Sequence, residues 1–201
     1  MSEAVAKLED WREVPKARIA MWLLIGGELV IFGAIIVSYL MARIRYPEWA
    51  EQTAFTIPAA GFFNTFVLLT SSWTAVMAHG AAHKKEVKKA LMFLGVTLLG
   101  GVIFLCVKAF EYHHDIEMGL TMTSPKLIAE GKYIESVFWT YYYTMTGFHA
   151  SHVIVGMTII AIVMMQIRKG ENLHRVEYAG MYWHFVDLVW IFLFPLLYIA
   201  K

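Results

Sequence analysis

The sequence predicts an all-α, polytopic membrane protein: a single membrane domain over residues 1–201, built as a bundle of five transmembrane helices. Composition is the first observation, since 59% of the residues are apolar and only 16% are charged. Soluble domains usually have about 45–50% apolar and about 25% charged residues. A chain of this size has too little interior to bury so much apolar surface in water, so a bilayer is the expected solvent.

The second observation is the length of the apolar runs. Crossing the hydrocarbon core takes about 20 mostly apolar residues in a helix. Five runs qualify, at residues 19–41, 57–79, 90–112, 137–167 and 179–200. The proline at position 58 suits the first turn of the second helix, and Pro195 is expected to kink the last helix near its end.

Basic residues predict the orientation of these spans. Residues 1–18 form a short polar segment that mixes acidic and basic side chains, unlike a secretory signal. Basic residues gather in this segment and in the loops after the second and fourth spans: Lys7, Arg12, Lys16, Arg18, Lys84, Lys85, Lys88, Lys89, Arg168, Lys169 and Arg175. The basic side of a membrane protein faces the cytoplasm. We therefore expect a cytoplasmic N-terminus and a periplasmic C-terminus, in a bacterial inner membrane.

Several functional classes have no support in the sequence. The net charge is +1, and no basic stretch is long enough to follow a nucleic-acid backbone. The one cysteine, Cys106, lies in an apolar run and reads as a small buried hydrophobe. There is no CxxC pair, phosphate-binding glycine loop, GxSxG or HExxH motif. We therefore expect no catalytic centre and no metal site in this chain.

An acidic residue is expected deep in the first span. Glu28 lies about nine residues into that helix, roughly 14 Å deep at 1.5 Å per residue. Small residues beside it, Gly26, Gly27 and Gly33, favour the close approach of another helix. Glu28 is therefore expected to face a protein neighbour. It is either a protonated carboxyl group that serves packing or an acid that responds to protons or lipid headgroups.

Two histidines share one face of the fourth span. Met145, His149, His152 and Gly156 follow one another at helical spacing. Two histidines on one face could ligate a metal, but a metal site needs further ligands, and no histidine pair on another helix supplies them. Interhelical hydrogen bonds are the favoured interpretation.

The last span carries a polar stripe of its own, with Glu177, His184 and Asp187 at helical spacing. His184 and Asp187 stand one turn apart and can hydrogen-bond with each other. In the third span, Lys108 is expected to neutralise Glu111. Polar residues of the second span are expected to hydrogen-bond to other helices: Asn64, Thr65, Ser71 and Ser72.

Five strings, in order and at matching spacing, resemble the third subunit of haem–copper respiratory oxidases. They are MWLLIGGELVIFG (Met21–Gly33), FNTFVLLTSSWTAVMAH (Phe63–His79), KAFEY (Lys108–Tyr112), TGFHASHVIVG (Thr146–Gly156) and YWHFVDLVWIFLF (Tyr182–Phe194). The resemblance runs over about nine-tenths of the chain.

The resemblance implies an accessory subunit of aerobic respiratory electron transport. Such subunits carry no haem or copper, dock beside catalytic subunit I, hold phospholipids in a cleft and help sustain proton uptake. Glu28 matches the intramembrane carboxylate of the family. Arg168 and Arg175, at the cytoplasmic ends of the fourth and fifth spans, are expected to contact lipid headgroups. The remaining matches are interior polar positions: Glu111, His149, His152, Glu177, His184 and Asp187. Larger members have seven helices, so either another subunit supplies the two that this chain lacks or the cleft is open.

Two alternatives remain beside a cytochrome c oxidase, the branch that the HFVDLVWIFLF and AFEY strings resemble most. One keeps the fold and role but places the chain in a quinol oxidase or a nitric oxide reductase. The other is a membrane haem protein that carries electrons itself. In that case His79 and His184 are the pair best placed to serve as axial ligands.

Overall fold

A computed structural model describes residues 16–47, 49–169 and 172–200. Within these residues the chain is helical and contains no strand, which confirms the all-α class. The helices in chain order are α2 (Lys16–Arg45), α3 (Trp49–Gln52), the 3-10 helix η2 (Thr53–Phe55), α4 (Pro58–His83), α5 (Val87–Glu117), α6 (Pro125–Ala129), α7 (Tyr133–Ile167), α8 (Arg175–Phe194) and the π-helix η3 (Pro195–Ile199).

Four of the described helices are long and apolar enough to cross a membrane. They are α2, α5, α7 and the continuous segment Arg175–Ile199. The expected second span corresponds to α4, which is not among these four although it has 26 residues. Its asparagine, serine and threonine side chains lower its mean hydropathy, because one side of the helix is used for hydrogen bonds to its neighbours.

The observed helices extend beyond the apolar runs. The first begins at Lys16 and ends at Arg45, whereas the apolar run covers residues 19–41. The third likewise covers Val87–Glu117, whereas the apolar run covers 90–112. Hydrophobicity marks the part of a helix that suits hydrocarbon, while backbone hydrogen bonding continues through polar turns. Of the polar segment 1–18, residues 1–15 lie outside the described residues.

Pro195 changes the backbone geometry of the last helix, as expected. The α-helix ends at Phe194 and a π-helical turn follows from Pro195 to Ile199. Proline has no N–H and cannot continue the α-helical ladder. The Ala200 N–H closes the wider turn by donating to the Pro195 carbonyl at 2.8 Å.

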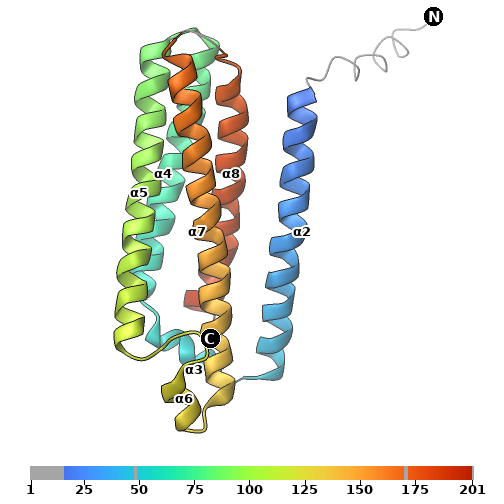
Figure 1. Cartoon of the computed structure of the whole chain (residues 1–201), viewed down its shortest axis with the longest axis vertical. Coiled ribbons are helices and arrows are strands. Elements are labelled where there is room, and N and C mark those ends of the chain that lie inside the picture. The colour runs from blue at the N-terminus through green and yellow to red at the C-terminus, as the bar shows by residue number, and fades with distance from the viewer. Residues whose placement is uncertain (1–15, 48, 170–171, 201) are drawn as a thin grey trace, which may run out of the picture.

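The helices α4, α5, α7 and α8 form a bundle, and α2 stands along one side of it (Figure 1). The bundle interior is unusually aromatic, with Phe104, Trp139, Tyr142, Trp183 and Trp190 essentially inaccessible. By contrast, only Phe32 and Tyr39 of α2 are buried. The described helices thus form a tightly packed bundle with one outer helix that buries few of its side chains.

The polar side chains of α4 form hydrogen bonds with neighbouring helices, as the sequence predicted. The indole N–H groups of Trp183 and Trp190 donate to Ser71 Oγ and Thr65 Oγ1, both at 3.0 Å. The Asn64 amide donates to the Phe104 carbonyl of α5 at 3.4 Å. These bonds replace the contacts with water that buried polar groups lose.

Glycines decide where helices approach closely, and within the described chain no helix approaches the glycines of α2. A Cβ added at Gly26, Gly27 or Gly33 would meet nothing within 4 Å. The close approach lies in α5 instead. A Cβ at Gly100 would stand 2.7 Å from Ser71 Cβ.

We predict that Gly100→Ala destabilises the protein by about 1–3 kcal/mol, the usual cost of overpacking. The clash involves a Cβ atom, which moves only with the α4 backbone. Thermal unfolding of the purified complex in detergent measures the effect. Gly95→Ala in the same helix is the matched control, because it meets nothing within 4 Å and should be neutral or slightly stabilising. Equal melting temperatures for the two variants would contradict the packing argument.

Candidate functional site

Glu28 of α2 reaches across to α7 and forms a pair with His152. Glu28 Oε2 lies 3.0 Å from His152 Nε2, and both side chains are mostly buried. This confirms that Glu28 faces a protein neighbour. The neighbour is an imidazole within the same chain, 124 positions away.

The hydrogen bonds around His152 define where protons can sit. His152 Nδ1 lies 2.8 Å from the Phe148 carbonyl, which can only accept, so Nδ1 carries a proton. Nε2 then either accepts from a protonated Glu28 or, as an imidazolium, donates to a carboxylate. In both cases one proton is shared between Oε2 and Nε2. In either arrangement the pair is neutral overall.

The Glu28–His152 pair sits along a partly open seam between α2 and the bundle. A groove of about 420 Å³ lies toward one end of the seam, between α2, α7 and the start of α8. Its walls are mainly apolar, and Arg175 stands among the lining residues. A second groove of about 340 Å³ lies toward the other end, between Ala34, Ile35 and Tyr141.

Polar contacts at intervals hold α2 to the bundle. Arg18 pairs with Glu177 of α8 at 2.6 Å, and Ser38 Oγ lies 2.7 Å from the Tyr141 hydroxyl. At the far end, the Tyr39 hydroxyl donates to the Leu196 carbonyl at 3.0 Å, and the Arg43 guanidinium donates to the Ala200 carbonyl. With Glu28–His152 between them, these contacts fix α2 in position while leaving the grooves open.

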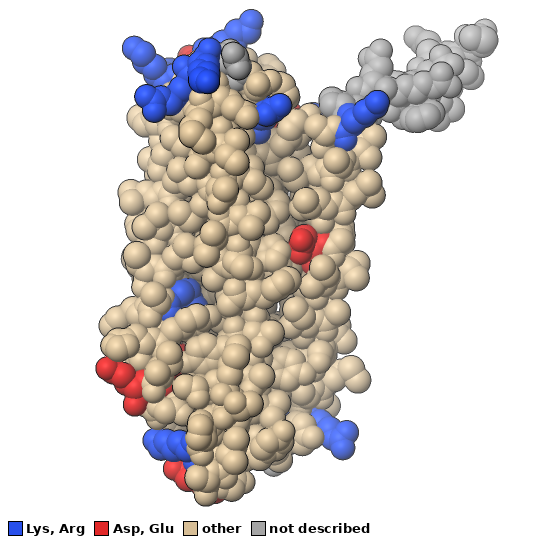
Figure 2. Space-filling view, viewed as in Figure 1, with Lys and Arg blue, Asp and Glu red and all other residues tan. Residues whose placement is uncertain are grey.

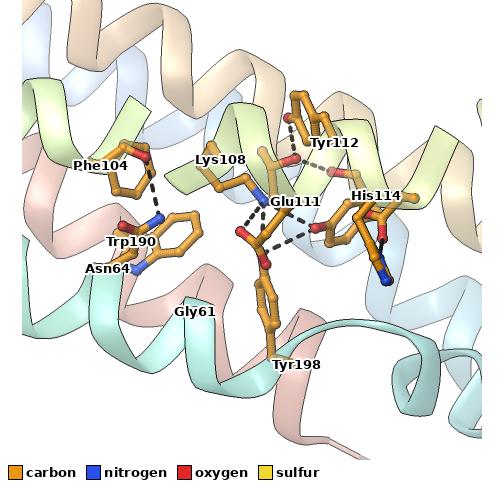
Figure 3. Close-up of polar contacts among 12 residues, drawn as sticks. Gly61, Asn64, Phe104, Lys108, Glu111, Tyr112, His114, Trp190 and Tyr198 are labelled. Atoms are coloured by element: carbon orange, nitrogen blue, oxygen red, sulfur yellow. Dashed lines mark hydrogen bonds and ion pairs between the residues drawn. The ribbon is translucent and has the colours of Figure 1, made fainter. Parts of the chain in front are cut away.

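A second polar cluster lies inside the bundle, around Lys108 and Glu111 (Figure 3). Lys108 Nζ is 3.1 Å from Glu111 Oε2, and both side chains are almost completely buried. This confirms the expected neutralisation, but in the protein core. The ammonium group also donates to the hydroxyls of Tyr142 at 3.1 Å and Tyr198 at 2.8 Å.

Aromatic rings surround the Lys108 ammonium group. Its nitrogen lies 4.9 Å from the ring centroid of Tyr112, 4.8 Å from that of Tyr142 and 5.5 Å from that of Tyr198. Ring faces attract cations, most strongly where water is excluded. The Tyr198 hydroxyl in turn donates to Glu111 Oε2 at 3.2 Å. This cluster therefore joins α5, α7 and the π-helical turn after α8.

His149 and His152 occupy different surroundings, although they share a helix face. The His149 ring is completely buried and lies against Phe104 and Trp190, and neither of its nitrogens has a hydrogen bond within the described residues. Among those residues, the interhelical hydrogen bond expected of this pair is made by His152. Three residues along a helix turn the direction by about 60°, enough to aim one ring into the bundle and the other at α2.

His184 and Asp187 differ from expectation. His184 Nδ1 bonds Ser72 Oγ of α4 at 2.6 Å, so a hydroxyl from another helix takes the place predicted for Asp187. Asp187 is buried, and within the described part of the chain neither of its oxygens has a hydrogen bond of good geometry. Its side chain also lies near Ser72, so both residues that were predicted to pair face the same α4 hydroxyl.

The remaining predicted residues lie at the end of the bundle where α7 and α8 are joined. Glu177 accepts from Arg18, and Arg175 donates to Gln166 Oε1 at 3.0 Å. Arg168 ends α7 and lines a shallow hollow with Lys169. Figure 2 shows Lys and Arg gathered at this end of the molecule.

Sequence reasoning missed the tyrosines that surround Lys108, and it missed Ser38–Tyr141. The spacing of Lys108, Glu111, Tyr112 and Asp115 on one face of α5 was an available signal for a polar core. The partners on α7 and in the π-helical turn η3 had no local signal. Cys106, which was expected to be buried, is exposed. Among the residues that the structure describes, no group of three or more His, Cys, Asp or Glu side chains could hold a metal ion.

Apolar helices long enough to cross a bilayer, with buried polar pairs such as Lys108–Glu111 between them, define a helical membrane protein. Comparison with known proteins is more specific. A family described as "Cytochrome c oxidase subunit III" matches residues 14–201, so the chain belongs to that family. It is an accessory subunit III of a terminal oxidase.

Individual relatives agree with this assignment. The chain is 32% identical to "Probable cytochrome c oxidase subunit 3" of Rickettsia bellii, over 90% of this chain and 68% of that protein. It is also 32% identical to "Cytochrome c oxidase subunit 3" of Bacillus subtilis, over 90% of this chain and 84% of that protein. The protein from Bacillus sp. PS3 is 31% identical over 90% of this chain and 84% of its own length.

We predict that Lys108→Met destabilises the complex by roughly 3–5 kcal/mol, because Glu111 is left buried without its counter-charge. Detergent-solubilised thermal unfolding and the yield of assembled complex measure the effect. Lys108→Met combined with Glu111→Leu removes both charges and should recover most of the loss. A double variant as unstable as the single one would show that the ion pair is not the source of the effect.

Proposed function

We propose that this subunit III binds phospholipid along its α2 side, stabilises catalytic subunit I and supports proton uptake into it. The chain itself carries no haem, copper or catalytic centre on this proposal. Reduction of O₂ and proton pumping take place in partner subunits.

The observation that carries the proposal is the Glu28–His152 pair beside the open seam. A lipid acyl chain suits the apolar walls of the grooves, and the pair is the polar feature at middle depth. Because the pair shares one proton without changing its net charge, it can stand next to hydrocarbon at low cost. Removing either partner would expose the other to lipid without compensation.

A headgroup suits the basic end of the same seam. Arg175 lines the 420 Å³ groove, together with Tyr178 and Ala179. Arg168 stands at the end of α7 nearby in sequence, and arginine binds phosphate through a planar fork of donors. A phospholipid with its phosphate near Arg175 and its chains between α2 and α7 satisfies both parts of the groove.

We further propose that α4 is a membrane span in addition to the other four, which makes five. The basic end of the molecule then lies in the cytoplasm of a bacterial cell. An α4 of 26 residues is about 39 Å long, enough to cross the hydrocarbon core. It also runs beside α5 in the bundle, so the two helices share the same depth. The collected Lys and Arg at one end favour this orientation.

We predict that Glu28→Ala leaves the haem content of the purified oxidase unchanged but lowers bound phospholipid and shortens sustained turnover. The cause is an unpaired His152 that draws water into the seam. Lipid phosphorus per haem and the decay of O₂ consumption with time measure the two effects. Thr158→Ala on α7 is the control, since its hydroxyl bonds only the Ile154 carbonyl of its own helix among the described residues. Loss of haem in the Glu28→Ala variant would contradict the proposal.

Affinity purification of this subunit tests the complex and its electron donor. We expect a large haem a-containing partner and oxidation of cytochrome c, because the relatives carry the name cytochrome c oxidase. A partner with haem b and quinol oxidation would move the chain to the quinol branch with the same role. A chain that came alone with a haem spectrum would overturn the proposal and make histidines such as His184 ligands.

A further inference from the structure

The turn between α4 and α5 borders a groove that the α2 seam does not explain. The groove has a volume of about 470 Å³ and is lined by residues of both helices, among them Val76, Met77, Lys84 and Phe93. The helices α4 and α5 lie on the side of the bundle away from α2 (Figure 1). We propose that this groove binds an anionic phospholipid, with its phosphate at Lys84 and one acyl chain against Val76, Met77 and Phe93.

The turn beside the groove has an excess of positive charge. Residues 84–89 read KKEVKK, and of these Lys84, Glu86 and Lys89 line the groove. Glu86 pairs with Lys89 at 2.8 Å, and this hydrogen bond lowers the pKa of the Glu86 carboxyl group. The pair leaves Lys84 as the second lysine of the groove, and Lys85 and Lys88 are exposed on the same turn.

The wall of the groove is apolar and continues toward the middle of the helix. Val76 and Met77 are half exposed on α4. Gly80, one turn before Lys84, leaves a notch where an added Cβ would meet nothing within 4 Å. The exposed α4 face continues away from the rim through Trp73, Leu69 and Phe66 at helical spacing. An acyl chain that starts beneath Lys84 thus finds a continuous apolar path.

Charge and depth together select this occupant. A soluble phosphate would satisfy the lysines but not the apolar wall, and a neutral lipid would satisfy the wall but not the excess positive charge. Lysines at a membrane surface attract anionic lipids with about 1 kcal/mol each, which corresponds to roughly fivefold in affinity. The groove is separate from the α2 seam, so the two lipid sites can be tested independently.

Native mass spectrometry of the intact purified oxidase, titrated with phosphatidylglycerol or phosphatidylethanolamine, tests this inference. We expect the wild-type complex to favour phosphatidylglycerol. Lys84→Gln should weaken one phosphatidylglycerol-binding event roughly fivefold. Gly80→Leu keeps every charge but fills the notch, and should weaken the same event. Lys169→Gln, at the same end of the molecule on the α7–α8 turn, is the matched control and should leave it unchanged.

Three outcomes would overturn the inference. If phosphatidylglycerol binding is unchanged in both groove variants, the groove is not a binding site. An equal loss in the Lys169→Gln control shows attraction to the whole basic surface and no specific groove. A partner subunit found seated against Val76 and Met77, with no lipid between, assigns this face to protein contact. Subunit composition is recorded for every variant, so a loss of assembly is recognised separately.

Discussion

The buried pair of Lys108 and Glu111 is the interaction on which the arrangement of the bundle depends. Two charges in an apolar interior are tolerated only when each finds its partner and the remaining hydrogen bonds are met. Here Tyr142 from α7 and Tyr198 from the π-helical turn accept from the ammonium group, and Tyr198 also donates to Glu111 Oε2. Glu111 Oε1 has no hydrogen bond within the described residues. Three segments that are distant in sequence must therefore come together at one point, and the rotation of α5 relative to α7 is fixed by it. The π-helical turn after Pro195 belongs to the same constraint, since it carries Tyr198 into the core.

The attachment of α2 follows a different principle. This helix buries little surface and is held by separate polar contacts, from Arg18–Glu177 at one end to Arg43 and the Ala200 carbonyl at the other. Isolated hydrogen bonds position a helix without filling the space beside it, so grooves remain between them. The Glu28–His152 pair is the contact in the middle of this series. Its chemistry, one proton between two mostly buried groups, suits a place where protein meets hydrocarbon.

Positive charge at one end of the molecule connects both surfaces that we assign to lipid. Arg175 stands at the end of the α2 seam, and Lys84 stands at the end of the α4–α5 groove. In each case an apolar wall continues from the basic residue toward the middle of a helix. On these two proposals, lipid would lie on two sides of the bundle. That property is consistent with a subunit that stabilises a catalytic partner without taking part in its chemistry.

The sequence by itself determined the features that depend on spacing along one helix. The length of the apolar runs predicted the helical membrane class. The i, i+3 spacing of Lys108 and Glu111 predicted their pairing, and the α4 hydroxyls were recognisable as interhelical donors and acceptors. Only the tertiary structure decided contacts between helices. In the structure His184 bonds Ser72 rather than Asp187. The glycine positions of α2 contact no other helix of the described chain. The tertiary structure also brought Glu28 to His152. The physical reason is that helical periodicity fixes which residues share a face, whereas the rotation and depth of each helix follow from packing against all the others.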